Sequence, residues 1–188
     1  MRSFIAIELP ETARSALERL QGELKKCGAD IRWVRPEHIH LTLKFLGDIK
    51  EEDVAGIAED IKGTCSRYPA FKLAISGMGV FPNTKSPRVL WVGLDNSGVL
   101  SGIYNEIEAG MASLGFEREN RRFVPHLTLG RFRSPRGKDG LLEKMETCKN
   151  SEFGLIEVNS VSLMRSDLGP EGAKYTRLAD FRLRSRDR

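Results

Sequence analysis

The sequence has few cysteines and no long hydrophobic segment. Its 188 residues include three cysteines, Cys27, Cys65 and Cys148, which lie far apart and form no C-x-x-C pair. Isolated cysteines in odd number argue against a disulfide framework or a zinc ribbon, so we expect reduced thiols in a cytoplasmic protein. No apolar run could cross a membrane, and the first one, residues 4–7, is too short for a signal peptide.

The motifs that bind nucleotide cofactors are also missing. The chain has no G-x-x-x-x-G-K-[ST] loop, and the glycines within residues 77–79 are followed by Pro82 instead of a third glycine. The segment KDG at residues 138–140 lacks the spacer of the lysine motif in nucleotide-dependent ligases. We therefore expect no cofactor, and any joining reaction would use a strained phosphodiester of the substrate itself.

The charge is small overall but unevenly distributed. Hydrophobic residues make up 40% and charged residues 30%, with a formal net charge of +4, which is typical of a globular domain. Residues 118–138 nevertheless contain seven basic side chains and a single acid, Glu119. Such a local positive field can attract a polyanion while the whole protein stays nearly neutral.

An internal repeat organises the chain. The segment HLTL at residues 40–43 recurs at residues 126–129, and the same offset of 86 places the apolar run 4–7 over residues 90–93. Apolar spacing and turn residues predict the order β-α-β-α-β in each half. The predicted helices cover residues 13–24, 54–61, 100–114 and 141–145. Further strands are predicted at residues 71–80, 155–164 and 175–183.

Two such units predict an α+β fold. We expect one bilobal domain over residues 1–188, with two lobes related by a pseudo-twofold axis. Helices would cover the outer face of each antiparallel sheet, and the two uncovered faces would meet across a central cleft.

The repeated motif suits acid–base chemistry at phosphorus. In a strand, His40 and Thr42 share one face, as do His126 and Thr128, while the leucines point to the other. A neutral imidazole can take a proton from the attacking oxygen, and a protonated one can supply a proton to the leaving oxygen. The hydroxyls can donate to the non-bridging oxygens. Pseudo-symmetry does not say which histidine is the acid.

Other side chains could complete this site. A positive charge could come from Arg131 or Arg133, but regular alternation puts Arg131 on the leucine side unless the strand bends at Gly130. Three aromatic residues could stack a base, although core packing is the ordinary role for each: Trp33, Phe45 and Phe81.

Two other kinds of protein are considered. His38 and His40 could bind a metal, but position 38 corresponds to Val124 in the second repeat, and no set of three or four ligands is evident. A metal-dependent hydrolase is therefore one alternative. The other is a non-catalytic nucleotide- or RNA-binding module on the same fold.

Several segments resemble the RNA 2′,3′-cyclic phosphodiesterase family, also called the 2′-5′ RNA ligase family, of the two-histidine phosphoesterases. They are residues 33–47 (WVRPEHIHLTLKFLG), 125–131 (PHLTLGR), 163–166 (LMRS) and 172–175 (GAKY), together with the strand 4–7. The resemblance covers essentially the whole chain. It implies hydrolysis of an RNA 2′,3′-cyclic phosphate to a 2′-phosphate, and in some members reversible 2′-5′ joining of RNA.

The resemblance also implies individual roles. His40 resembles the proton donor to the leaving 3′ oxygen, and His126 the proton acceptor that activates water. Thr42 and Thr128 resemble phosphate-contacting hydroxyls, and Arg131 a phosphate-binding cation. The expected partners are RNA ends or tRNA halves with a 2′,3′-cyclic phosphate, bound by a monomer without metal.

Overall fold

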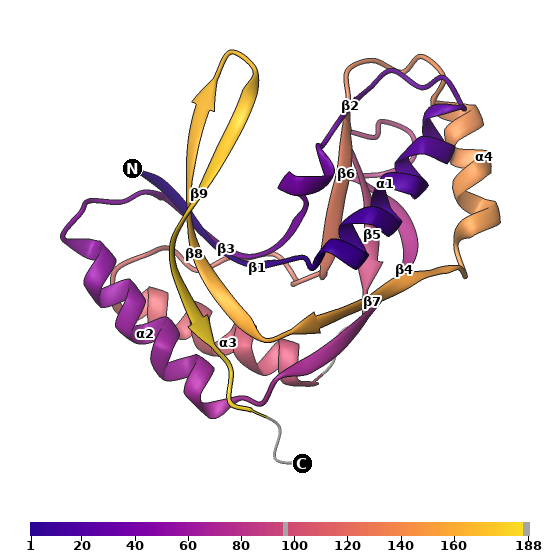
Figure 1. Cartoon of the computed structure of the whole chain (residues 1–188). Coiled ribbons are helices and arrows are strands. Elements are labelled where there is room, and N and C mark those ends of the chain that lie inside the picture. Colours follow the sequence, from indigo (N-terminus) through magenta and orange to yellow (C-terminus); the bar gives the residue numbers. More distant parts are fainter. Residues whose placement is uncertain (96–97, 186–188) are drawn as a thin grey trace.

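A computed structural model describes residues 1–95 and 98–185 of the chain (Figure 1). The first half forms β1 (Arg2–Glu8), α1 (Glu11–Lys25), β2 (Ile31–Trp33), the 3-10 helix η1 (Pro36–His38), β3 (His40–Asp48), α2 (Asp53–Arg67) and β4 (Phe71–Phe81). The second half forms β5 (Val89–Leu94), α3 (Gly98–Ser113), β6 (His126–Phe132), α4 (Lys138–Cys148), β7 (Glu152–Val158), β8 (Ser160–Gly169) and β9 (Gly172–Arg182). The predicted α+β class, with antiparallel sheets and helices, is confirmed.

The strands form two sheets that do not coincide with the two halves of the sequence. Strand order is β3-β1-β8-β9 in the four-stranded sheet and β2-β6-β5-β4-β7 in the five-stranded sheet. Strand β4 of the first half thus pairs with β5 and β7, while β8 of the second half pairs with β1. Each sheet needs strands from both halves.

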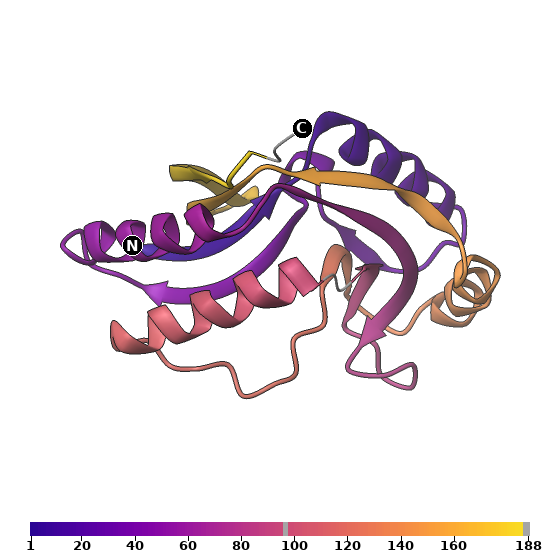
Figure 2. The ribbon, with the colours of Figure 1, turned by 90° about the horizontal axis from the view of Figure 1, so that it is seen from below.

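The strand predicted at residues 155–164 is two strands in the structure. Strand β7 pairs with β4, whereas β8 pairs with β1, so the chain must leave one sheet and enter the other at Asn159. Figure 2 shows this path, in orange, passing from one side of the molecule to the other. A pattern of apolar residues cannot show such a change of partner, because it indicates which residues are buried but not the strand with which they pair.

The helices also pack against strands from the other half of the sequence. Helices α2 and α3 contact each other and the strands β8, β9 and β3, whereas α1 contacts β7 and α4 contacts β4. The side chain of Gln21 in α1 donates to the carbonyl of Leu129 in β6 over 3.0 Å. The first helix of each half therefore covers the sheet that holds the histidine strand of the other half.

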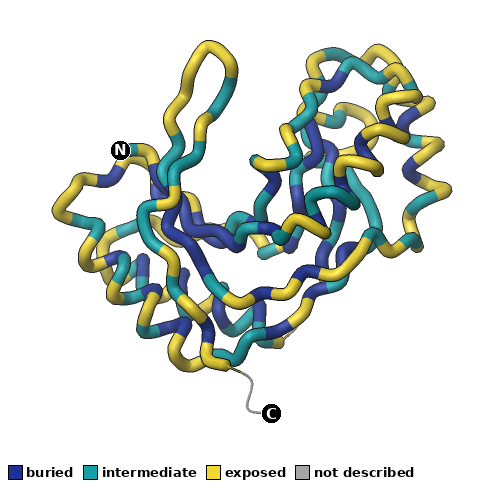
Figure 3. Tube along the Cα trace, viewed as in Figure 1, coloured by how far each residue is buried: buried dark blue, intermediate teal, exposed yellow. Residues whose placement is uncertain are grey.

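The apolar spacing that predicts the helices is also the face that they bury. In α1, Leu17 and Leu24 are fully buried, and in α3 Ile103 and Ile107 are as well. One core cluster includes residues of both sheets and all four of these side chains. Figure 3 shows the outer turns of the helices and the end of the β8–β9 hairpin as exposed.

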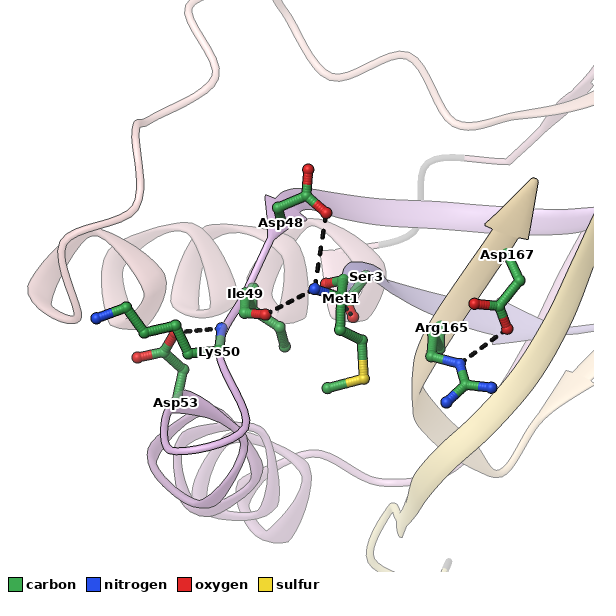
Figure 4. Close-up of polar contacts among 8 residues, drawn as sticks. All are labelled: Met1, Ser3, Asp48, Ile49, Lys50, Asp53, Arg165 and Asp167. Atoms are coloured by element: carbon green, nitrogen blue, oxygen red, sulfur yellow. Dashed lines mark hydrogen bonds and ion pairs between the residues drawn. The ribbon is translucent and has the colours of Figure 1, made fainter.

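The start of β1 is fixed to the end of β3 (Figure 4). The amino group of Met1 donates to the carbonyl of Ile49 over 2.9 Å and lies 3.6 Å from Oδ1 of Asp48. The backbone N–H of Lys50 donates to Oδ2 of Asp53 over 2.8 Å, where α2 begins. These contacts hold the β1–β3 pair in register at the end away from the histidine.

A buried ion pair connects β3 with α3. The ammonium of Lys44 lies 2.8 Å from Oε1 of Glu108, and both side chains are less than a tenth exposed. Lys44 also donates to the carbonyl of Glu117, and Oε2 of Glu108 accepts from the backbone N–H of Glu119 over 3.0 Å. The pair therefore anchors the segment that leads from α3 to the second histidine.

Removing one member of this pair should destabilise the protein strongly. In Lys44→Met the Glu108 carboxylate stays buried without its cation, so we expect the free energy of unfolding to fall by about 3–5 kcal/mol. The double variant Lys44→Met/Glu108→Leu should regain much of that loss. Urea denaturation measures both. The control is Lys50→Met, which removes the exposed pair with Glu52 and should cost less than about 1 kcal/mol. Equal losses for the two lysine variants would contradict the argument.

Candidate functional site

Each histidine motif opens a strand. His40 is the first residue of β3 and His126 the first residue of β6, and these two strands contact each other although they belong to different sheets. Within the motifs the leucines are buried and the histidines and threonines are partly exposed. The predicted alternation is confirmed, because the histidine and threonine of each motif lie on one face of their sheet and the leucines on the other. We call the face that carries the histidine and threonine the open face of that sheet.

The β1–β3 and β5–β6 ladders correct one detail of the repeat. His40 lies opposite Glu8, and His126 lies opposite Gly93. The strands β1 and β5 therefore correspond at an offset of 85 residues, not 86. The difference matters because a shift of one residue exchanges the two faces of a strand.

Both imidazoles are held by the same hydrogen bond. Nδ1 of His40 lies 2.8 Å from the carbonyl oxygen of His38, and Nδ1 of His126 lies 2.7 Å from that of Val124. A carbonyl only accepts, so each Nδ1 carries a hydrogen. In the neutral ring Nε2 is then the unprotonated nitrogen, and this is the atom that can exchange a proton with a substrate.

Aromatic rings pack against both imidazoles. The ring of Phe4 stacks on His40 with centroids 4.8 Å apart, and Tyr175 meets His40 edge-on at 5.2 Å. Phe81 meets His126 edge-on at 5.0 Å, and Trp91 lies 6.1 Å from it. These contacts restrict each ring to one orientation. They also give Phe81 a role beside a histidine instead of in the main core.

Burial lowers the pKa of both histidines below the ordinary value of 6.5. At His40 the hydrogen bond to His38 and the negative charge of Glu8 oppose this lowering. At His126 the bond to Val124 opposes it, whereas the positive charge of Arg131 adds to it. The two sites thus share a geometry but differ in the charged groups that act on the ring, which are Glu8 and His38 at His40 and Arg131 at His126.

A bulge in β6 brings Arg131 to the open face. Thr128 lies opposite Trp91, but the next pair is Gly130 with Leu90, so one residue of β6 is passed over. Alternation restarts after it, and Arg131 lies opposite Val89 on the same face as the motif threonine. The bend near Gly130 on which the prediction depended is present.

Gly130 itself is required by the neighbouring strand. A Cβ atom at this position would lie 2.4 Å from a methyl carbon of Ile31 and 3.2 Å from the carbonyl oxygen of Arg32. A side chain at residue 130 would therefore require Ile31 to move, and glycine lets β2 pair closely with β6 without that shift.

The threonine hydroxyls are available on the open faces. Thr42 lies opposite Ala6 and Thr128 opposite Trp91, each two residues beyond its histidine. Within residues 1–95 and 98–185 neither hydroxyl makes a hydrogen bond to the protein. Both can therefore donate to an oxygen of a bound group.

A charged network beside His40 was not predicted from the sequence. Oε2 of Glu8 accepts from Nε of Arg177 over 2.7 Å and from the hydroxyl of Ser162 over 2.9 Å. Ser162 also lies 3.0 Å from Oδ1 of Asp180. Glu8, His40 and Tyr175 line a common hollow, of which His126 is not a lining residue. Only the placement of β8 beside β1 brings these groups together, so no local pattern could have shown the network.

The metal-binding alternative finds no ligand cluster in the part of the chain that the structure describes. His38 faces Tyr175, with ring centroids 5.2 Å apart. No group of three or more histidine, cysteine or acidic side chains gathers as a metal site among residues 1–95 and 98–185. The described helices include none that is long and apolar enough to cross a membrane.

A duplicated fold in which each half contributes one His-x-Thr strand is the architecture of the two-histidine phosphoesterases. The chain matches the LigT-like phosphoesterase family over residues 7–91 and 92–175. It belongs to this family.

Relatives and solved structures agree with this assignment. The chain is 39% identical to an RNA 2′,3′-cyclic phosphodiesterase of Methanothermobacter thermautotrophicus over 97% of its own length and 99% of that protein. Its structure is similar to the crystal structure of TT0787 of Thermus thermophilus, with 30% identity, a TM-score of 0.83 and complete coverage of both chains. It is also similar to E. coli LigT complexed with 3′-AMP, with 25% identity, a TM-score of 0.76 and 97% coverage of both chains.

The lowered pKa values predict a specific pH dependence of stability. As the pH falls below about 6.5, histidines of the unfolded chain take up protons, whereas His40 and His126 of the folded protein take them up only at a lower pH. The free energy of unfolding should therefore fall as the pH drops through 6.5, until the folded histidines are protonated too. Urea denaturation at pH 7.5 and 5.5 measures this change. NMR titration of the ring protons should give midpoints below 6.5 for His40 and His126, and a midpoint above 6.5 for either would contradict it.

Proposed function

We propose that the protein hydrolyses 2′,3′-cyclic phosphate ends of RNA to 2′-phosphates, without a metal ion. One observation carries the proposal: two imidazoles lie on strands that contact each other, each with Nδ1 anchored to a backbone carbonyl and with no hydrogen bond from Nε2 to any described residue. The names of the relatives support the substrate class. Both motifs come from one chain, which supports a monomer as the active form.

The proposed reaction is a displacement at phosphorus. Nε2 of His126 takes a proton from water as the water oxygen forms a bond to phosphorus. The bond between phosphorus and the 3′ oxygen breaks, and Nε2 of His40 gives its proton to that oxygen. The product carries a 2′-phosphate and a free 3′ hydroxyl. Thr42, Thr128 and Arg131 would stabilise the charge that gathers on the non-bridging oxygens.

The charges beside the two rings support this assignment of acid and base. The Glu8 carboxylate faces His40 from the neighbouring strand and favours its protonated form. Gly93 takes the corresponding place opposite His126, and the charge of Arg131 favours the neutral ring there. These two charges thus favour the protonated form at His40 and the neutral form at His126, as this assignment of acid and base requires.

The same groups could join RNA ends. If a 5′ hydroxyl of RNA replaced water, His126 would take its proton, and breakage of the bond to the 3′ oxygen would leave a 2′-5′ linkage. The energy of the strained cyclic ester would drive this step, so ATP would not be needed.

We propose that tRNA halves are among the substrates. The three free cysteines support a reducing, cytoplasmic location.

Loss of either imidazole should remove most of the activity. An RNA oligonucleotide ending in a 2′,3′-cyclic phosphate should yield the 2′-phosphate isomer, identified by chromatography against both standards. His40→Ala and His126→Ala should each lower kcat by about 10²–10⁴-fold. The matched control is His38→Ala, since only the backbone of His38 bonds to His40. Near-normal turnover by either test variant would refute the mechanism.

Loss of activity in a chelator and recovery with zinc would favour a metal-dependent hydrolase. Binding of a nucleotide without turnover would favour a non-catalytic binding module.

Removal of the charge on Glu8 should move one limb of the pH–rate profile. In Glu8→Gln the protonated form of His40 loses a favourable charge, so the alkaline limb should move to lower pH while the acidic limb stays in place. The control is Glu37→Gln, which removes an exposed carboxylate that lines the same hollow. Kinetics over pH 5–9 decide the assignment. Movement of the acidic limb instead would mean that His40 acts as the base.

A further inference from the structure

The short strand β2 places a second arginine on the open face of the five-stranded sheet. Arg32 lies directly opposite Arg131 in the β2–β6 ladder. Side chains of directly opposite residues project to the same face of a sheet, so Arg32 shares the open face with Arg131. Its neighbours in β2 project to the other face. Ile31 is buried in the main core, and the ring of Trp33 packs against that core and lies 5.7 Å from the ammonium of Lys25 in α1.

Neither of these two guanidiniums has an acidic partner. Within residues 1–95 and 98–185, neither forms an ion pair or a hydrogen bond, and both residues are exposed. The arginines that do pair with carboxylates are Arg14, Arg67, Arg136, Arg165 and Arg177. Like charges directly opposite each other on neighbouring strands are destabilising. The pair Arg32–Arg131 therefore opposes folding in the free protein, and an anion bound beside it would relieve the repulsion.

The guanidinium of Arg32 reaches the hairpin of the other sheet. A Cβ atom at Gly172, where β9 begins, would lie 3.5 Å from Nη2 of Arg32. Figure 1 shows the β8–β9 hairpin projecting beyond its sheet on the same side of the molecule as β2. The same hairpin places Tyr175 against His40, with ring centroids 5.2 Å apart. Arg32 thus extends from the sheet that carries His126 to the hairpin that contacts His40.

The first repeat has a different side chain at the position of Arg131. In the pairing of β3 with β1, the bulge falls between Thr42 and Lys44. Phe45 therefore follows the motif threonine by three residues, as Arg131 does, and is 70% exposed. The expectation that Phe45 packs in the core is wrong, because the bulge turns it outward. Strand β3 is also the edge of its sheet, whereas β6 has β2 beside it. The facing pair of arginines thus belongs to one open face.

We propose that Arg32 binds the phosphate that joins the terminal nucleotide of the RNA substrate to the nucleotide before it. The proposal rests on the proposed function and adds a second phosphate site to it. The charge of Arg131 acts on the ring of His126, which suits a contact with the reacting phosphate. Arg32 lies one strand farther out, where the next phosphate of the chain can meet it. A guanidinium can donate two parallel hydrogen bonds to a phosphate, and such contacts position a nucleic acid without reading its bases.

A second phosphate site would distinguish RNA ends from mononucleotides. A nucleoside 2′,3′-cyclic monophosphate carries only the reacting phosphate, so it offers nothing for Arg32 to bind. An oligonucleotide with the same end carries one more phosphate at the next position. The protein should therefore have a lower KM for the oligonucleotide than for the mononucleotide, whichever bases they contain.

Two RNA oligonucleotides with the same 2′,3′-cyclic phosphate end test the assignment. One has the natural linkage before the terminal nucleotide, and the other has an uncharged methylphosphonate there. In both, the nucleotide before this linkage is a 2′-deoxynucleotide, so that no 2′ hydroxyl can attack it. Arg32→Gln should raise KM for the natural linkage by about 5- to 20-fold with little change in kcat, and leave KM for the methylphosphonate unchanged. Arg32→Lys should keep part of the affinity, because lysine retains the charge but not the paired hydrogen bonds.

The controls separate this contact from general effects of charge and folding. Arg19→Gln removes an exposed arginine of α1, on the helix-covered side of the same sheet, and should change KM for neither RNA. Arg32→Gln should be at least as stable as the wild type in urea, because the repulsion from Arg131 is relieved. An unchanged KM for the natural linkage in Arg32→Gln would overturn the proposal. An equal rise for both RNAs would also overturn it, because Arg32 would then act on the reacting phosphate.

Binding of ligands that resemble the product separates a failure of this proposal from a failure of the proposed function. Calorimetry compares two dinucleotides that end in a 2′-phosphate, one with the natural linkage and one with a methylphosphonate. The wild type should bind the first about 5- to 20-fold more tightly, and Arg32→Gln should bind both equally. Absence of turnover with this difference would refute the hydrolase and keep the second phosphate site. Turnover without the difference would refute the site and keep the hydrolase.

Discussion

One residue in each histidine strand is passed over by the hydrogen-bond ladder, and this bulge decides which side chains reach the open faces. Before it, the histidine and threonine of each motif point outward and the leucines inward. After it the parity changes, so that Phe45 and Arg131 point outward as well. The same change directs Lys44 into the interior, where it meets Glu108. A regular strand would have buried the guanidinium and exposed the ammonium.

The bulges are equivalent, but their surroundings differ. Strand β6 has β2 as an outer neighbour, and a Cβ atom at Gly130 would collide with the Ile31 side chain of β2. Strand β3 is the edge of its sheet, so its corresponding residue can be Lys44 with a long side chain. A pair of similar strands thus places a cation, Arg131, on one open face and an exposed aromatic ring, Phe45, on the other. The two copies of the repeat share a backbone geometry, and the residues that differ between them give the two open faces different side chains.

Much of the architecture follows from local patterns in the sequence. The four helices, most of the strands and the alternation within the HLTL segments depend on side chains near one another in the chain, and these could be predicted. The short strand β2 was not predicted, and the apolar residues 155–164 predict one strand where β7 and β8 are two. The exchange of β4 and β8 could not, because any strand with buried alternate residues can pair with several partners. The hydrogen-bond network around Glu8 depends on that exchange, since Ser162 and Arg177 reach Glu8 only through β8 and β9. The exposure of Phe45 depends on the bulge, which leaves no mark in the hydrophobic pattern.

The exchange of strands has a consequence for the origin of the repeat. A polypeptide with a single copy would possess β1 and β3 but would lack the strand that lies on the other side of β1. In the arrangement seen here, a strand from a second molecule would fill that gap, and its own last strand would fill the same gap in return. An ancestor of half this length would therefore be an intertwined dimer, and fusion of two such genes would convert its intermolecular pairing into the connections seen in this single chain.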